Sequence, residues 1–173
     1  MTDGFEIDVE VRGGERAVVV LHNLPEDILK EVRLAMFDAA TLLRTNAIAG
    51  IEEGPKTGRK YARQFKKSKH GRWKKKAFKW HTASRPGEYP AYDTGALTGS
   101  LIIDTGEDSV EMGSSMAEVR KGKEKGDPQY PKWLEEGTPK GKMKPRPWLE
   151  PTLMASRGAI RRMIRESVKK AIP

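Results

Sequence analysis

Few side chains in this sequence of 173 residues have the type and spacing that metal binding or catalysis requires. The three histidines, His22, His70 and His81, have neither helical spacing from one another nor a thiol partner, so a zinc site is not predicted. The chain has no cysteine, which also excludes disulfides and thiol nucleophiles. Since the sequence contains no phosphate-binding loop, nucleophile elbow or dinucleotide fingerprint, we expect neither a metal nor a cofactor.

Two neighbouring carboxylates and several hydroxyl groups remain as candidates for catalysis. Glu135 and Glu136 could act as general acid and base, but adjacent residues need not face one cleft, and acids are common beside turns. Thr94, Ser100 and Thr138 have no base positioned by a local motif, so they fit helix caps and turns better than nucleophiles. The sequence therefore predicts that the protein is not an enzyme.

Charge is distributed very unevenly along the chain. The net charge is +9, and the stretch Pro55 to Ser84, the basic segment, contains twelve basic residues and no acidic one. These residues are Lys56, Arg59, Lys60, Arg63, Lys66, Lys67, Lys69, Arg72, Lys74, Lys75, Lys76 and Lys79. Of the 33 lysines and arginines, 21 remain outside the basic segment against all 24 acidic residues, so the rest of the chain has a net charge of −3. The excess of positive charge is therefore local.

Aromatic residues are interleaved with these cations. They are Tyr61, Phe65, Trp73, Phe78 and Trp80. Cations attract phosphates and rings stack on bases, so the mixture is typical of nucleic-acid surfaces, although the same rings could anchor a protrusion to the core or to a neighbouring subunit. Arms of similar length flank His70 and Gly71, which predicts a projecting hairpin or loop that turns there. The twelve cations, with Trp73 and Trp80, are the candidate contacts with nucleic acid or with a partner.

The first third of the chain predicts a β-hairpin and a long helix. Phe5 to Val11 alternates apolar and acidic residues, and Ala17 to Leu21 forms a second strand after a glycine turn. Pro25 suits the first turn of a helix, in which an apolar stripe continues for about 25 residues until Gly50 and Pro55 end it. The stripe consists of Ile28, Val32, Ala35, Met36, Ala39, Leu42 and Leu43. We expect this helix to pack on a sheet.

A stiff stretch and a short capped turn follow the basic segment. Two prolines fix the backbone between Arg85 and Pro90. Asp93 or Thr94 can cap a short helical turn by accepting a backbone N–H, and Gly95 permits the change of direction. Leu97 would then point into the core.

The remaining elements complete the predicted fold. Residues 101–104 and 110–113 form two strands joined by a turn, residues 120–128 form a mobile polar loop, and Pro139 to Pro145 forms a lysine-bearing loop. A final helix runs from Pro147 through Ala171. Together these elements predict a single α+β domain over residues 1–173, in which a mainly antiparallel sheet packs against two long helices with projecting basic and Lys-rich loops.

Three short stretches share their order and spacing with a known family. They are RPGEYPAYDTGAL from Arg85 to Leu97, EEGTP from Glu135 to Pro139, and RPWLEP from Arg146 to Pro151. In this respect the chain resembles the neck or tail-completion proteins of tailed bacteriophages, which are head-tail joining, minor tail components. It departs from the commonest family pattern at Glu136, where an aromatic residue is frequent, and at Trp148, where Phe is commoner. The motif residues that the resemblance marks are Thr94, Gly95, Leu97, Glu135, Gly137, Thr138, Arg146, Pro147 and Trp148.

The resemblance implies a structural virion protein that forms a ring, a hexamer or a dodecamer, and joins the DNA-filled head to the tail. Its neighbours would be a head-closure or adaptor ring and tail-terminator or tail-tube proteins, and it would be made and assembled in the cytoplasm of the bacterial host. No segment approaches the roughly 18 uninterrupted apolar residues of a membrane-spanning helix, so we expect no membrane contact.

Two points stay open at the level of sequence. Arg146 and Trp148 are the strongest candidates for an anchoring pair at an interface, but Trp148 could equally be an ordinary core residue. The basic segment could line the passage and touch genomic duplex DNA without sequence preference, or it could grip an acidic neighbouring ring. The alternative function is a free-standing basic nucleic-acid-binding module that uses residues 56–80, with the motifs serving folding alone.

Overall fold

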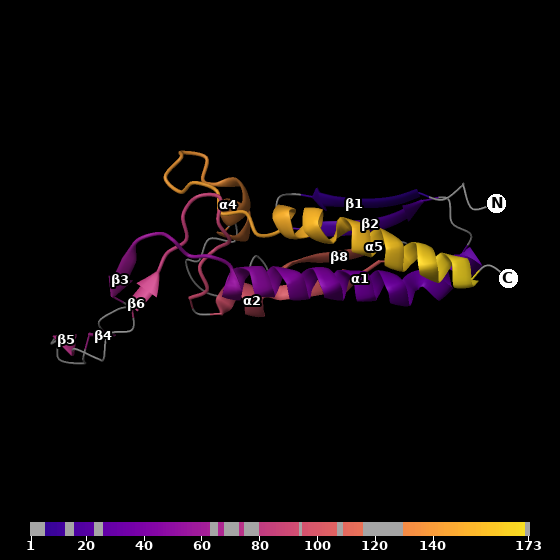
Figure 1. The fold of residues 1–173 in the computed structure, drawn as a ribbon, viewed down its shortest axis with the longest axis horizontal. Coiled ribbons are helices and arrows are strands. Elements are labelled where there is room, and N and C mark those ends of the chain that lie inside the picture. The colour runs from indigo at the N-terminus through magenta and orange to yellow at the C-terminus, as the bar shows by residue number, and fades with distance from the viewer. Residues whose placement is uncertain are drawn as a thin grey trace.

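The computed structural model describes residues 6–12, 16–22, 26–62, 66–67, 73–74, 80–93, 95–106, 109–115 and 130–171. Its centre is a four-stranded antiparallel sheet in the order β1-β2-β8-β7, with two long helices against it (Figure 1). The strands are β1 (Glu6–Arg12), β2 (Arg16–His22), β7 (Leu101–Thr105) and β8 (Ser109–Ser114). The helices are α1 (Glu26–Glu53) and α5 (Glu150–Ala171). The predicted α+β fold is confirmed.

Two local hairpins are joined into one sheet by a long-range strand pair. β1 pairs with β2, as the alternating sequence predicts, and β7 pairs with β8 with Ile103 opposite Met112. β2 and β8 then pair with Val19 opposite Val110. Opposite residues of antiparallel strands share a face, so Val19, Val110 and Met112 lie on one face, and all three are buried.

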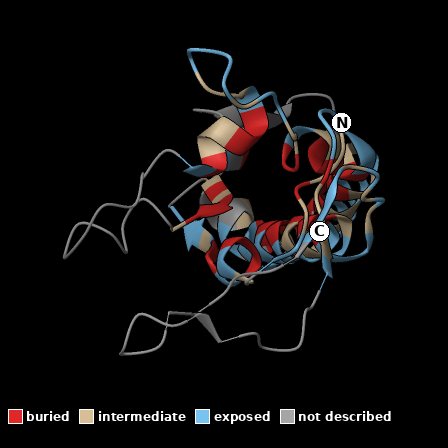
Figure 2. Ribbon diagram, turned by 90° about the vertical axis from the view of Figure 1, so that its left-hand side faces the viewer, coloured by how far each residue is buried: buried red, intermediate tan, exposed pale blue. Residues whose placement is uncertain are grey.

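Both long helices cover this face of the sheet. Val32, Met36 and Leu43 of α1 and Ile160 and Ile164 of α5 belong to the same buried cluster as the sheet residues. Figure 2, viewed from one end of the molecule, marks the buried and the exposed positions along the helices. The predicted apolar stripe of α1 is therefore its core face, and the helix has 28 residues.

The short helix α2 (Ala96–Gly99) begins differently from the prediction. Its N-cap is Gly95, which has φ 73° and makes no side-chain hydrogen bond. Gly95 therefore occupies the N-cap position in place of the predicted Asp93, and the predicted cap at Thr94 lies outside the described residues. Because glycine tolerates a positive φ without steric penalty, Gly95 turns the chain directly into the helix, and Leu97 is buried as predicted.

The described strands of the basic segment form two antiparallel pairs that project from one end of the molecule (Figure 1). Strands β3 (Lys60–Ala62) and β6 (Trp80–Thr82) pair with Tyr61 opposite His81, and β4 (Lys66–Lys67) pairs with β5 (Trp73–Lys74). We call these four paired strands the arm. The predicted projecting hairpin is confirmed for these strands, whereas its turn at His70 and Gly71 and the predicted loop at 120–128 lie outside the described residues.

Candidate functional site

The stretches that carry the family-like motifs meet at one end of the molecule. EEGTP begins at the end of α4 (Tyr130–Glu136), RPWLEP leads into α5, and the proline-rich stretch bonds to the residues that precede α5. Gly87 N donates to Pro145 O at 3.0 Å, and Arg146 N donates to Leu134 O at 2.6 Å. We call residues 84–90, 134–139 and 143–152 the motif corner.

A buried carboxylate fastens α4 to the start of α5. Glu135 Oε2 accepts hydrogen bonds from Trp148 N at 2.8 Å and Leu149 N at 3.0 Å, and Oε1 accepts one from Glu150 N at 2.9 Å. The first N–H groups of a helix have no partner within the helix, and a negative charge is favoured at that end. These bonds explain why α5 begins at Glu150 and not at the predicted Pro147.

Glu135 and Glu136 have separate partners. Glu135 is buried and is held by the three backbone groups of the α5 start, whereas the exposed Glu136 lies 4.0 Å from Lys132 Nζ. The two carboxylates therefore do not face a common cleft, and Glu135 has a structural role.

Trp148 and Arg146 both make contacts within the chain itself. Trp148 is fully buried in the core, and its Nε1 donates to Pro131 O at 3.5 Å, so an interface role for this ring is wrong and the core alternative holds. Arg146 is half-buried, and its Nε donates to Ser84 O at 3.1 Å. Pro147, between them, is half-buried as well.

Gly137 and Thr138 end α4 and close the loop that follows. Gly137 has φ 83°, and a Cβ there would lie 2.9 Å from Met143 O. Thr138 Oγ1 accepts a hydrogen bond from Met143 N at 2.9 Å, while Thr138 N donates to Met143 O at 3.0 Å. The prediction that Thr138 is a turn residue is confirmed, because its hydroxyl group closes this loop.

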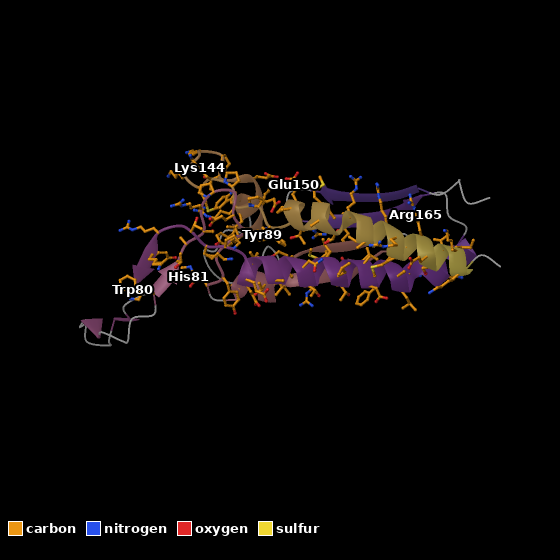
Figure 3. The ribbon with its side chains drawn as sticks, viewed as in Figure 1. Trp80, His81, Tyr89, Lys144, Glu150 and Arg165 are labelled. Carbon is orange, nitrogen blue, oxygen red and sulfur yellow. The ribbon has the colours of Figure 1, made fainter. Side chains whose placement is uncertain are left out.

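Tyr89 links the motif corner to both long helices (Figure 3). Its hydroxyl group lies 3.1 Å from Thr152 Oγ1. Because Thr152 Oγ1 itself donates to Trp148 O, the Tyr89 hydroxyl is the donor to Thr152. On the other side, a Cβ on Gly50 of α1 would lie 2.3 Å from Tyr89 Cε1. Sequence reasoning treated Gly50 only as the end of a helix, although a glycine that continues a helical pattern is a signal of close packing.

Glu88 fixes the base of the arm. Its carboxylate accepts hydrogen bonds from the Thr57 hydroxyl group, from Arg85 N at 2.8 Å and from Thr57 N at 3.1 Å. These bonds, the Thr57 hydroxyl first, lower the pKa of Glu88 to about 2. Thr57 and Arg85 precede and follow the arm, so one carboxylate ties both legs together. No local pattern in the sequence indicated this contact.

The structure places the candidate contacts of the basic segment in three groups. Lys56 is half-buried, donates to Gly54 O, and has a pKa lowered by burial. Arg59, Lys60 and Trp80 are exposed, and Trp80 retains 67% of its accessible surface. Lys66, Lys67, Trp73 and Lys74 lie on the paired strands β4 and β5. Arg63, Lys69, Arg72, Lys75, Lys76 and Lys79 lie outside the described residues.

Comparisons of the chain with protein-family models, with curated proteins and with solved structures give no match. Within the described part of the chain, no helix is both long and apolar enough to span a membrane. Among those same residues, no group of three or more histidine or acidic side chains could hold a metal ion. The candidate site consists of the motif corner and of the arm that adjoins it.

Removing the negative charge of Glu135 should destabilise the protein. Glu135→Gln is expected to lower the free energy of unfolding by about 1–3 kcal/mol, because a buried amide cannot accept all three backbone hydrogen bonds. Glu136→Gln is the matched control, with an expected change within about 0.5 kcal/mol because its ion pair is exposed. Urea denaturation measures both. Equal effects of the two substitutions would contradict a capping role for Glu135.

Adding one methyl group at Gly50 should also be destabilising, although alanine is the better helix former. We expect Gly50→Ala to lower the free energy of unfolding by more than about 1 kcal/mol, because its Cβ collides with the Tyr89 ring. Gly158→Ala on α5, where no atom lies within 4 Å, is the control and should stabilise by about 0.5–1 kcal/mol. Coupling in a double-mutant cycle with Tyr89→Ala tests the assigned contact, and strictly additive effects would refute it.

Glu88 should stabilise the base of the arm only while its carboxylate is ionised. Since the folded protein lowers its pKa from 4.5 to about 2, this contribution is complete above about pH 4.5 and is lost as the pH falls toward 2. An NMR titration of the Glu88 carboxyl carbon should have its midpoint near 2. Thr57→Ala removes the largest cause of the shift, so its midpoint should rise toward 4.5. An unchanged midpoint in that variant would rule out the Thr57 contact.

Proposed function

We propose that the protein is a structural subunit of a tailed-phage virion that assembles as a ring at the head-tail junction and joins the DNA-filled head to the tail. The observation that carries the proposal is the motif corner. Three stretches that resemble the neck and tail-completion family in order and spacing bond to one another through Gly87, Glu135 and Arg146. They thereby form one rigid support from which the arm projects.

The motif residues support this function as scaffold. Glu135 and Trp148 are buried, and Gly137 makes a turn that a side chain would obstruct. A subunit that is packed between two neighbouring rings needs a rigid backbone at such turns. Its contact surfaces then keep the same position relative to both neighbours. The residues that contact partners would then lie on the arm and on the two sides of the body, by which we mean the four-stranded sheet with α1 and α5.

One flank of the body is the outer side of α1 together with strand β7. Arg44 Nε donates to Leu101 O at 3.0 Å, so this side of α1 lies along the edge of the sheet. Phe37, two helical turns earlier, shares that side and is 46% exposed, and Leu34 beside it is 77% exposed. A groove of about 510 Å³ lies between these residues and the turn at Gly106.

The opposite flank consists of α5 and strand β1. Asn46 Nδ2 donates to Ser156 Oγ at 3.0 Å, so these residues mark the sides on which α1 and α5 face each other. Met154 lies about 200° around α5 from Ser156, and it is 61% exposed. β1 and β7 are the two edge strands of the sheet. Each flank therefore combines a strand edge with exposed apolar residues. Because the two flanks differ, one flank of a copy would pair with the other flank of the next copy. Such head-to-tail contacts can close into a ring.

Lysine on either flank should weaken assembly. Leu34→Lys and Met154→Lys are each expected to raise the dissociation constant between copies at least about tenfold, because each buries a charge at the interface. Ala49→Lys, at an exposed position of α1, is the control. Leu34→Lys leaves the α5 flank intact, and Met154→Lys leaves the α1 flank intact. An equimolar mixture of the two variants can therefore form one intact interface and should give dimers. Light scattering measures the masses, and assembly of either variant like the wild type would contradict the proposed flanks.

The location of the protein tests the function itself. Antibody-gold labelling of virions from the producing host, imaged by electron microscopy, is expected to mark the junction between head and tail. A chain that is absent from virions, stays monomeric and binds duplex DNA in a strongly salt-dependent way would instead be the free-standing nucleic-acid-binding module.

A further inference from the structure

A second group of lysines lies on the loop between Thr138 and Pro145, outside the basic segment. Lys140, Lys142 and Lys144 on this loop are all exposed. Neither the fold nor the motif corner uses their side chains, since among the described residues no hydrogen bond or ion pair of their ammonium groups is found. We call residues 138–145 the lysine loop.

Backbone contacts hold the lysine loop in one shape. Thr138 and Met143 exchange two hydrogen bonds, of 2.9 and 3.0 Å, and Gly141 N donates to Thr138 O at 2.8 Å. Gly141 has φ 64°, a conformation that glycine adopts freely. The three lysines are therefore presented by an ordered turn, so binding a ligand requires little further ordering of the backbone.

The lysine loop is also fastened to the base of the arm. Pro145 O accepts from Gly87 N at 3.0 Å, while Arg146 donates from Nη1 to Lys144 O at 3.3 Å and from Nε to Ser84 O at 3.1 Å. Ser84 follows β6 by two residues. Lys144 and Trp80 accordingly lie at the same end of the molecule (Figure 3).

Four acidic groups near the motif corner and the base of the arm have internal partners, whereas Glu150, at the same end, is exposed (Figure 3). Glu135 accepts three backbone hydrogen bonds, Glu88 is bonded to Thr57 and Arg85 N, and Glu136 lies 4.0 Å from Lys132 Nζ. Asp93 Oδ1 lies 3.7 Å from His81 Nδ1. The partners named above for these four carboxylates do not include the lysine loop, Arg59 or Lys60, whose cations are exposed to solvent.

Exposed aromatic rings lie on the arm and at the start of α4, at the same end of the molecule as these cations. Tyr61 and Trp80 of the arm retain 44% and 67% of their accessible surface, and Tyr130 at the start of α4 retains 40%. Tyr61 is oriented by an edge-to-face contact with His81, at a centroid distance of 5.2 Å. Cations beside exposed ring faces suit phosphates and bases better than they suit an acidic protein, which offers carboxylates but no large flat rings to stack on.

We propose that the lysine loop, Arg59, Lys60 and the exposed rings of Tyr61 and Trp80 form one nucleic-acid-binding surface. The lysines bind backbone phosphates without sequence preference, and the rings stack on unpaired bases where the strand is single. The lysine loop is the part of this surface that lies outside the arm, and its backbone is held by hydrogen bonds. It does not depend on assembly at a head-tail junction, since a free-standing module would contain it as well.

The lysines are tested by the salt dependence of DNA binding. The full-length chain is titrated against a labelled mixed-sequence duplex of about 20 base pairs between about 50 and 200 mM NaCl. Replacing Lys140, Lys142 and Lys144 by glutamine should reduce the slope of log K against log salt by about 2–3, because each lost phosphate contact removes about 0.9. The matched control replaces three exposed cations at the far end of α5, Arg165, Lys169 and Lys170, and should leave the slope unchanged.

Each outcome decides the proposal. An unchanged slope in the lysine-loop variant, or an equal change in the α5 control, would overturn it, as would equal affinity for polyglutamate of the same length. Trp80→Ala should weaken binding of a single strand about tenfold and binding of the duplex less, because only unpaired bases offer their faces. Equal losses on both ligands would refute stacking. Location in the virion is measured separately, so failure here and failure of the proposed function are distinguishable.

Discussion

The carboxylate of Glu135 is the contact on which this end of the molecule depends. It lies at the end of α4 and accepts hydrogen bonds from Trp148, Leu149 and Glu150 as α5 begins. A buried charge is tolerated only when such partners satisfy it, so the position of α4 and the first turn of α5 are fixed together. Trp148 is thereby held in the core, and its carbonyl group receives the Thr152 hydroxyl that bonds to Tyr89.

This arrangement separates the residues that shape the fold from the exposed cations and aromatic rings. The motif residues that resemble the phage family are mostly committed to internal bonds or to the core, as Glu135, Gly137 and Trp148 illustrate. Exposed cations and rings lie on the arm and on the lysine loop that the motif corner supports.

Long-range contacts supply what local patterns cannot. The pairing of β2 with β8 joins strands that are about ninety residues apart, and the Glu88 carboxylate ties together residues on both sides of the arm. Tyr89 fits against α1 only because Gly50 has no side chain. In each case the partner is chosen by the folded backbone, and neither residue alone indicates it.

The sequence by itself determined the elements whose signals are local: the hairpin from its alternation, α1 from its apolar stripe, and the arm from the symmetry of its basic segment. It also indicated the motif stretches, but it could not tell whether Trp148 faced a partner or the core, nor which residue capped α5. The tertiary structure decided these points, because burial and the capping of a helix end depend on residues distant in the chain, such as Glu135 for α5. The position of the lysine loop beside the arm likewise depends on tertiary contacts, since Pro145 O accepts from Gly87 N and the adjacent Arg146 donates to Ser84 O.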